Sequence, residues 1–490
     1  MKHAVKRGAL ALALATSALA TPFSAPGVSA NETLPATTVL NLANLQVVKT
    51  DTAVPGITRT EYSGAPYKGP WKVNVVVIDP DLAPVNLKGT FGTGLGMGLG
   101  TSQTTTSMLD GLTTTNVRKP LVGINGGFFD GNMKNPAEDT WDGDLNGVVI
   151  QGGKLLSEAV RGKGGKPVST SLVLQHGRAY ITELSTTLKI KPKGSTNPTE
   201  ERQLDGINRV PGRASHCEQP DPADTGVPPE TQDRDTGVCE DPSEIISFTK
   251  EYGTKTPTTA FIVTPNDPDV VTPPDAKRIS SDEGFEVVLD SANNVTACFD
   301  SKLPVTGSGC TEVANRGGNQ VSNGGRILQG IGEGADWLRA RTRRGSGFDF
   351  PEEVVDTRFN TRLSLDSSMY VTAGGDLLVR NGHIEYTDPA GSIDNRPRTA
   401  VGTDHLGRTV LVTVDGIDDP NNVVSIGATR GELATLMHDL NVLDAVNMDG
   451  GGSTTLVWEQ KLVNIPTDGN ARERAVGDTV YAGPGGYPMA

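Results

Sequence analysis

The segment 445–458, AVNMDGGGSTTLVW, places groups that could bind and react between two apolar runs. It supplies a carboxylate, an amide and a hydroxyl, and its three consecutive glycines let backbone N–H groups turn toward one another. A tight turn needs only one glycine, so we interpret this loop as an anion-binding concavity that suits phosphate. The alternative is a sharp turn between two strands. The predicted binding residues are Asn447, Gly450, Gly451, Gly452 and Ser453, with Asp449 as a catalytic residue.

Three further segments share this pattern of a strand that runs into a polar turn. They are GINGGFFD (123–130), RPRTAVG (396–402) and VTVDG (412–416). Sites are commonly built at such strand ends. They add Asp130 and Asp415 as candidate catalytic carboxylates, and Asn125 and Gly126 as candidate binding residues. Paired carboxylates are the usual groups for cleaving a glycosidic bond, although a lone Asp also ends strands by bonding its own backbone.

Arg398 is the predicted phosphate ligand. A guanidinium group presents a planar fork of donors to phosphate oxygens, and the preceding Pro397 stiffens the start of the strand. The alternative for any single arginine is a solvated surface charge.

Metal and serine chemistry have weaker signals. The histidines are scattered singly, without the spacing of zinc ligands. The sequence lacks a Gly-x-Ser-x-Gly motif with a histidine partner in the expected order, so a serine hydrolase is only weakly supported. A divalent cation such as calcium on the cluster of Asp residues stays open.

The first thirty residues resemble a secretory signal peptide, because three basic residues precede the Ala/Leu-rich run 8–20. We therefore expect an exported, extracellular protein without a membrane span. Removal of this leader would move the net charge from −14 to about −17, which argues against nucleic acid as a partner. In an oxidising compartment four cysteines favour disulfides, and three pairings are possible. The short separations favour Cys217–Cys239 and Cys298–Cys310.

The 59 glycines and 32 prolines, together with short alternating apolar runs, predict many strands and tight turns with few helices. A capping box, Thr429 with Glu432, predicts one clear helix that ends before Asn441, and a weaker helix is expected over about 104–112. The fold class is therefore α+β, a strand-rich domain of mixed sheets. We expect a signal peptide over 1–30, an extension over 31–69 and one domain over 70–485, with surface insertions near 211–245 and 333–362.

Several segments, taken in order, resemble the phosphodiester glycosidase domain family. The similarity adds DGINRVPG (205–212) and its Asn208 and Arg209 as binding residues, and it ends with LVNIPTDGNARERAVGDTVYA (462–482). The resemblance implies hydrolysis of a sugar–phosphate diester at the anomeric carbon, which releases free sugar and a phosphomonoester. With a leader of bacterial type, the expected substrates are glycosyl phosphodiesters of the cell envelope, such as teichoic-acid-like or capsular polymers.

Two other function classes remain open at this stage. One is a non-catalytic cell-surface or polysaccharide-binding protein on the same fold, because a fold alone does not fix a function. The other is a phosphodiesterase that cuts the phosphorus–oxygen bond, for which paired His and Asp metal ligands would be expected.

Overall fold

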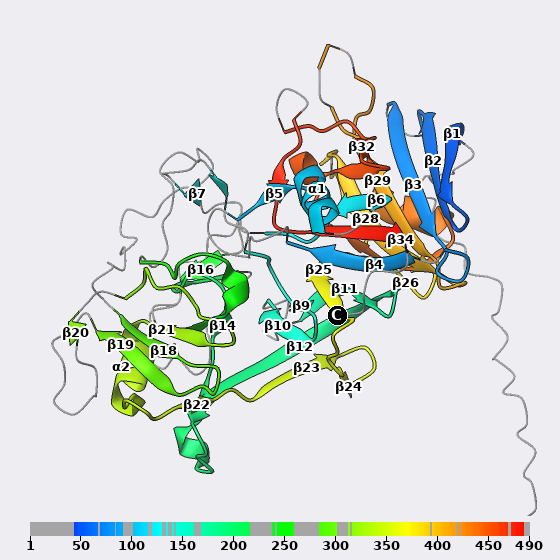
Figure 1. Cartoon of the computed structure of the whole chain (residues 1–490). Helices are drawn as coiled ribbons and strands as arrows, with labels where there is room; N and C mark the ends of the chain where they lie inside the picture. Colours follow the sequence, from blue (N-terminus) through cyan, green and yellow to red (C-terminus); the bar gives the residue numbers. More distant parts are fainter. Residues whose placement is uncertain are drawn as a thin grey trace, which may run out of the picture. The chain divides into compact units, whose positions relative to one another are not determined.

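The computed structural model describes residues 44–484 of the 490-residue chain, apart from several internal segments. Those segments are 67–68, 84, 92–100, 116–119, 130–133, 136–139, 142–143, 161–167, 216–237, 241–242, 259–283, 301–311, 314–315, 393, 418–419, 422 and 469–471. Strands dominate the described part, which contains three α-helices, and this confirms the strand-rich α+β class (Figure 1).

An eight-stranded antiparallel sheet forms the largest element that contributes to the candidate site. Every residue of its central strands β28 and β29 is buried, because both faces of the sheet are covered. Such strands read as nearly continuous apolar and Thr runs instead of alternating ones. In sheet order the strands are β1 (Leu45–Val54), β2 (Ile57–Gly64), β3 (Trp71–Ile78), β29 (Thr409–Val414), β28 (Arg398–Asp404), β30 (Val442–Asn447), β26 (Leu377–Arg380) and β27 (His383–Ile384).

A five-stranded antiparallel sheet packs on the eight-stranded sheet through a shared apolar core. Ile124 and Leu456 belong to this core together with Val76, Val401 and Val446 of the larger sheet. In order its strands are β32 (Lys461–Leu462), β31 (Leu456–Trp458), β6 (Val122–Asn125), β34 (Thr479–Pro484) and β4 (Val85–Thr90). Short pairs accompany it: β33 (Ala475–Val476) with β5 (Gln103–Thr104), and β7 (Lys134–Asn135) with β8 (Thr140–Trp141).

A nine-stranded sheet contributes to the same core through Leu172 and Tyr370, and to a second core that it shares with a six-stranded sheet. Its longest strand, β12, pairs with four other strands along its length (Figure 1). The nine strands are β10 (Lys154–Ser157), β9 (Val149–Gln151), β25 (Tyr370–Ala373), β11 (Ser169–Gln175), β12 (Arg178–Pro192), β23 (Glu352–Asp356) and β24 (Thr361–Arg362), with β13 (Arg202–Gln203) and β22 (Phe348–Asp349) also on β12.

The six-stranded sheet contains β14 (Gly206–Ile207), β17 (Ile245–Phe248), β21 (Arg326–Gly330), β18 (Phe285–Leu289), β19 (Val295–Asp300) and β20 (Glu312–Val313). Its outer pairs β14·β17 and β19·β20 are parallel, so the domain is mixed, as the sequence predicts. A separate ribbon joins β15 (Arg213–Ser215) to β16 (Val238–Glu240).

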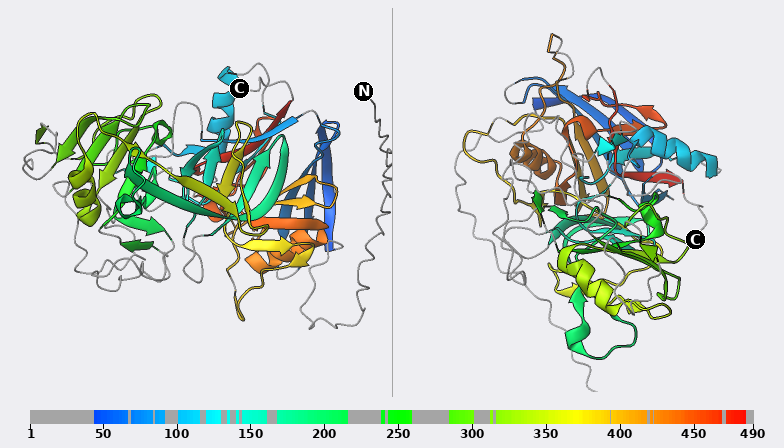
Figure 2. Two further views of the ribbon diagram at one scale, coloured as in Figure 1. Left: turned by 90° about the horizontal axis from the view of Figure 1, so that it is seen from below. Right: turned by 90° about the vertical axis from the view of Figure 1, so that its left-hand side faces the viewer.

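The predicted capping box is present at the start of α3 (Arg430–Asp439): the Thr429 hydroxyl accepts from the Glu432 N–H, and the Glu432 carboxylate accepts from the Thr429 N–H. Helix α3 covers the second face of the eight-stranded sheet with Leu433, Leu436 and Met437 (Figure 2). The weaker helix is α1 (Thr105–Thr115). Single 3-10 turns occur at Pro198–Glu200, Lys250–Tyr252 and Gly451–Ser453.

Two expected boundaries differ from the structure. The extension expected over 31–69 contains β1 and β2, which complete the eight-stranded sheet, so the folded domain begins well before residue 70. The insertion expected over 333–362 contains helix α2 (Gly332–Arg341), and its Leu338 and Phe348 are buried in the second core. The many charged residues of this segment made it look like a surface insertion, although a few of its apolar residues are buried. The segment 216–237, most of the other expected insertion, lies outside the described residues, as does the expected signal peptide.

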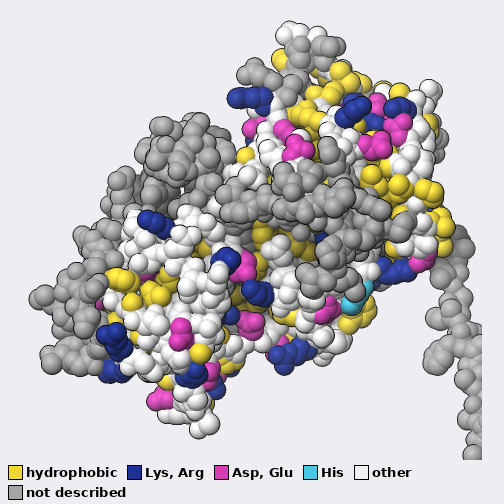
Figure 3. All heavy atoms as spheres, in the orientation of Figure 1, with side chains coloured by type: hydrophobic (Ala, Val, Ile, Leu, Met, Phe, Trp, Pro, Cys, Tyr) yellow, Lys and Arg dark blue, Asp and Glu magenta, His cyan; other side chains and the backbone are white. Residues whose placement is uncertain are grey.

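Charges of both signs are interspersed over the face shown in Figure 3. No helix in the described part of the chain is long and apolar enough to cross a membrane. Cys298 is buried and disulfide-bonded. Cys217 and Cys310 are not described, so the pairing of the four cysteines stays a prediction.

Candidate active site

The candidate site forms where strand ends of the eight-stranded and five-stranded sheets meet. The loop after β30 crosses the start of β28, because the Met448 N–H donates to the Thr399 carbonyl and the Gly451 N–H to the Pro397 carbonyl. The same loop reaches the end of β6, where the Asp449 N–H donates to the Gly126 carbonyl. Segments more than three hundred residues apart in sequence therefore converge, as the shared strand-to-turn pattern predicted.

Asn125, a fully buried residue at the end of β6, ties these segments together. Its amide donates to the Asp449 carbonyl over 2.8 Å, and its side-chain oxygen accepts from the Thr399 hydroxyl and the Thr455 N–H. The NH₂ group and the oxygen of the Asn125 side chain are thus both bonded to the protein. Asn125 therefore positions the loop. Asn447 is also buried, and no described residue forms a hydrogen bond with its Oδ1 atom.

The glycine loop has a different geometry from the predicted anion concavity. The Gly450 N–H donates to the Asp449 carboxylate and the Gly451 N–H to the Pro397 carbonyl, so neither is free for a phosphate. The N–H of Gly452 has no acceptor among the described residues. Gly451 has a φ of +60°, and a Cβ at its position would meet open space, which agrees with a glycine required for its backbone conformation.

Asp449 is the candidate reactive carboxylate. The residue as a whole keeps partial solvent exposure, although protein atoms surround its carboxyl group. Burial raises the pKa of Asp449 from 3.8 to about 6, while the Ser453 hydroxyl, the nearby Arg474 guanidinium and the Gly450 N–H oppose that rise. A carboxyl group that titrates close to neutral pH in an accessible position is suited to proton transfer.

Asp478, which the sequence reasoning did not select, lies directly behind this site and adds to the raised pKa of Asp449. It is fully buried at the start of β34, and its carboxylate accepts from the Gly127 N–H and the Tyr370 hydroxyl, both over 2.8 Å. Burial raises the pKa of Asp478 too. A Cβ on Gly126 would overlap this carboxylate, so Gly126 is a glycine because of packing against Asp478.

Asp415 is fully buried at the end of β29. Its Oδ2 atom accepts from the Ile465 N–H over 3.2 Å and lies 3.6 Å from the Lys72 ammonium, while Oδ1 has no hydrogen-bond partner in the described part of the chain. Burial raises the pKa of Asp415 to about 7. The segment is next to the site, since a Cβ on Gly416 would touch Pro397, but the Asp415 side chain itself does not reach the solvent.

Arg398 lies beside the loop, with its Cδ atom 3.8 Å from where a Cβ on Gly450 would be. Two of its three guanidinium nitrogens are occupied: Nε donates to the Ala428 carbonyl, and Nη2 donates to the carbonyl and the carboxylate of Asp394. Burial lowers the pKa of Arg398, and Arg430 and Arg396 lower it further. Much of the hydrogen-bonding capacity of Arg398 therefore holds the chain around it.

Arg474, also missed from the sequence, reaches the opposite end of the same glycine loop. Its guanidinium lies against Gly452, so that a Cβ there would be 2.6 Å from Cζ and nearer still to Nη2. Nε and Nη2 both donate to the Asp468 carboxylate, over 2.9 and 2.6 Å.

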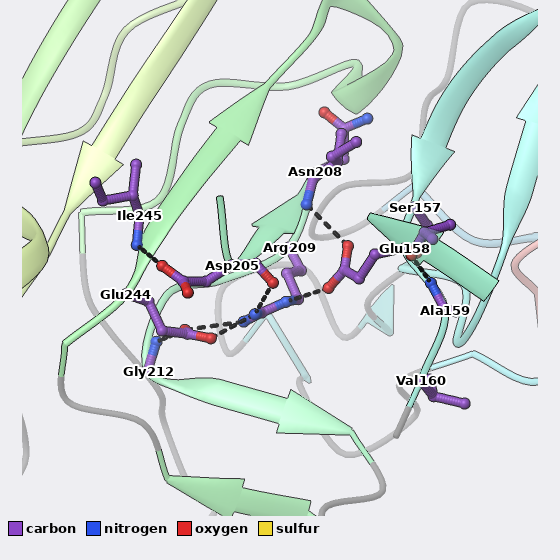
Figure 4. A network of polar contacts seen from close by, with 12 residues as sticks. Ser157, Glu158, Ala159, Val160, Asp205, Asn208, Arg209, Gly212, Glu244 and Ile245 are labelled. Carbon is purple, nitrogen blue, oxygen red and sulfur yellow. Dashed lines mark hydrogen bonds and ion pairs between the residues drawn. The ribbon is translucent and has the colours of Figure 1, made fainter. Parts of the chain in front are cut away.

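Asn208 and Arg209 have all their described contacts within the protein, at the edge of the six-stranded sheet (Figure 4). The Arg209 guanidinium bonds both oxygens of the buried Glu244 and one oxygen of Glu158. The Asn208 amide bonds the Leu156 carbonyl and the Thr249 side chain and N–H. These contacts hold the chain in place, and the role of Asn208 and Arg209 as binding residues stays a prediction.

Asp130 lies outside the described residues. Within the described ranges, no group of three His, Cys, Asp or Glu side chains could hold a metal ion, and the divalent cation that the sequence left open stays untested.

The fold is similar to that of solved structures. It is that of a putative exported protein from Burkholderia pseudomallei, with a TM-score of 0.63 at 24% identity over 85% of this chain and 75% of that one. A hypothetical protein from Synechocystis shares it with a TM-score of 0.57 at 16% identity, over 88% and 62% of the two chains. These likenesses concern the fold alone.

The part of the chain that carries much of the site is similar to a known family. Residues 302–482 match the phosphodiester glycosidase family, which confirms the resemblance over the part of the chain that carries Arg398, Asp449 and Arg474. Asn125 and Arg209 lie outside the matched region.

Part of the chain is similar to curated relatives. The bovine N-acetylglucosamine-1-phosphodiester alpha-N-acetylglucosaminidase is 30% identical over 181 residues, 33% of each chain, and the human enzyme of that name is 27% identical over 161 residues. An uncharacterized prophage-derived protein of Bacillus subtilis is 37% identical over 84 residues, 17% of this chain and 12% of its own. The match thus spans about a third of the length of the mammalian relatives.

Proposed function

We propose that this chain is an exported hydrolase of glycosyl phosphodiesters that cleaves the bond between the anomeric carbon and the phosphate oxygen. The observation that carries the proposal is the position of Asp449: of the three carboxylates described at the converging strand ends, it alone is partly exposed. It lies in the loop that the phosphodiester glycosidase family matches.

The chemistry of the leaving group explains why one accessible carboxylate is enough. A glycosidase that expels an alcohol needs a second carboxyl group to protonate it. A phosphomonoester leaves as a stabilised anion, so its departure needs positive charge more than a proton. In the proposed step the ionised Asp449 takes a proton from water as the water oxygen bonds to the anomeric carbon. The electron pair of the broken carbon–oxygen bond goes to the phosphate.

The remaining residues around the loop position Asp449. Asn125 fixes the backbone of Asp449 by donating to its carbonyl, and the Gly450 N–H donates to its carboxylate. The buried Asp478 disfavours a second negative charge nearby and so keeps Asp449 basic enough to accept a proton near neutral pH.

For the location and the substrate, the proposal rests on the amino-terminal sequence. The basic residues and apolar run of 1–30 support export, which would give the protein access to teichoic-acid-like or capsular phosphodiesters outside the cell. A non-catalytic polysaccharide-binding protein is the competing function.

The test is sugar release from a panel of glycosyl phosphodiesters, measured with the parent protein and with Asp449→Asn. We expect free sugar and phosphomonoester from at least one substrate, and a rate at least a hundredfold lower in the folded variant. Binding of the polymers without any turnover by the parent would favour the competing function, and an unchanged rate in Asp449→Asn would remove the carboxylate from the reaction.

A further inference from the structure

Arg474 and Arg398 flank the glycine loop from its two ends, but they differ in what holds them. Arg398 is only 7% exposed, and its bonds go to Asp394 and to the backbone at Ala428, so they fix the local chain. The Arg474 side chain is 36% exposed and is bonded on one side only, to a half-exposed Asp468. Its Nη1 atom has no partner among the described residues.

The contact with Gly452 places this guanidinium at the candidate site. The group lies where a side chain at residue 452 would be, so the third glycine of the loop makes room for an arginine. Gly452 belongs to the same loop as Asp449, and the positive charge of Arg474 opposes the rise in the pKa of that carboxyl group.

Asp468 fixes the direction of the arginine. Both Nε and Nη2 donate to the same Asp468 oxygen, which holds the guanidinium plane and leaves its other edge available. An arginine held this way presents a preformed pair of donors to a phosphate, with little side-chain freedom left to lose on binding.

We propose that Arg474, positioned by Asp468 and admitted by Gly452, is the residue that binds the phosphate of the substrate and receives the charge of the departing phosphomonoester. This inference rests on the proposed function for the identity of the substrate. It moves the main phosphate contact from Arg398, which the sequence suggested, to the other end of the loop.

Inorganic phosphate is the probe, and calorimetry with the full chain is the measurement. Arg474→Ala and Arg474→Lys remove the guanidinium. Gly452→Ala keeps the arginine but displaces it, because the new Cβ would overlap the flexible end of that side chain. Arg408→Ala is the matched control, since Arg408 is 37% exposed, bonds one carboxylate, Asp404, and lies at the far end of the β28–β29 hairpin.

We expect the dissociation constant for phosphate to rise at least tenfold in Arg474→Ala and Gly452→Ala, with a smaller rise in Arg474→Lys, while Arg408→Ala binds as the parent does. Equal binding by the parent and folded Arg474→Ala, or no binding by the parent, would overturn the inference. Phosphate binding that depends on Arg474 in a protein that releases no sugar from the substrate panel would support the inference and refute the proposed function.

Discussion

At the scale of single residues, three aspartates illustrate how surroundings decide what a carboxyl group can do. Asp415 and Asp478 are fully buried and are held by N–H or O–H donors, whereas Asp449 is partly open to solvent. Burial raises the pKa of all three, so the raised pKa does not by itself mark the reactive group. Accessibility separates Asp449 from the others.

The pKa of Asp449 predicts the pH dependence of the reaction. Because the ionised carboxylate is the active form and its pKa is raised to about 6, kcat/KM should rise with pH up to about 6 and level off above it. A pH–rate profile of the free enzyme measures this. A rate that falls as the pH rises through 6 would show that the protonated carboxyl group is the active form.

The raised pKa of Asp415 leads to a separate prediction about how the free energy of unfolding depends on pH. Its folded pKa of about 7 lies above its ordinary value of 3.8, so the stability it contributes is fully present below about pH 4 and is lost as the pH rises through 7. Asp415→Asn removes that loss while keeping the oxygen that accepts from Ile465. The variant should be more stable than the parent at pH 8, by up to about 4 kcal/mol, and similar at pH 4. Denaturant unfolding at both pH values measures the difference. A variant that is less stable at pH 8 would contradict the assignment.

At the scale of elements, the site lies at a sheet edge. In an antiparallel sheet, such an edge contains the end of one strand and the start of its neighbour. The end of β6 pairs with the start of β34, with Asn125 opposite Thr479. The sequence patterns identified polar residues that follow strands, which found Asn125 and Asp449. They could not find Asp478, because it precedes its strand, although the antiparallel pairing brings it to the same edge.

Local signals in the sequence predicted much of the fold. The Thr429 cap depends on a few adjacent residues, and it is present as predicted. Helix α2 was missed because its buried face is carried by Gly334, Ala335 and Leu338 among charges. Arg474 was missed because its contact with Gly452 depends on the tertiary fold, which no local pattern encodes.

Replacement of Arg209 tests whether this residue stabilises the edge of the six-stranded sheet or binds the substrate. Arg209→Met would leave Glu244 buried without the positive charge that pairs with it, which should cost about 3–5 kcal/mol of stability. Adding Glu244→Gln should recover part of that loss, as measured by denaturant unfolding. If Arg209→Met kept its stability and lost only activity, Arg209 would be a substrate ligand, as the sequence first suggested.

At the scale of the whole molecule, cross-links are expected to support sheets assembled from distant segments. Cys298 in β19 is already disulfide-bonded, and peptide mapping without reduction should show Cys298–Cys310 and Cys217–Cys239. Reduction should lower the free energy of unfolding by about 2–5 kcal/mol for each bond, because the unfolded chain gains freedom. A peptide that links Cys217 or Cys239 to Cys298 or Cys310 would contradict this pairing.

The central claim is that the enzyme cleaves the bond between the anomeric carbon and the phosphate oxygen. Hydrolysis in ¹⁸O-labelled water tests this claim most directly. With a glycosyl phosphodiester as substrate, attack at the anomeric carbon puts the label in the released sugar and none in the phosphomonoester. Mass spectrometry of both products after a single round of turnover should show that distribution. Label in the phosphate would mean that the phosphorus–oxygen bond is cut, and it would contradict the account of Asp449 acting at the sugar.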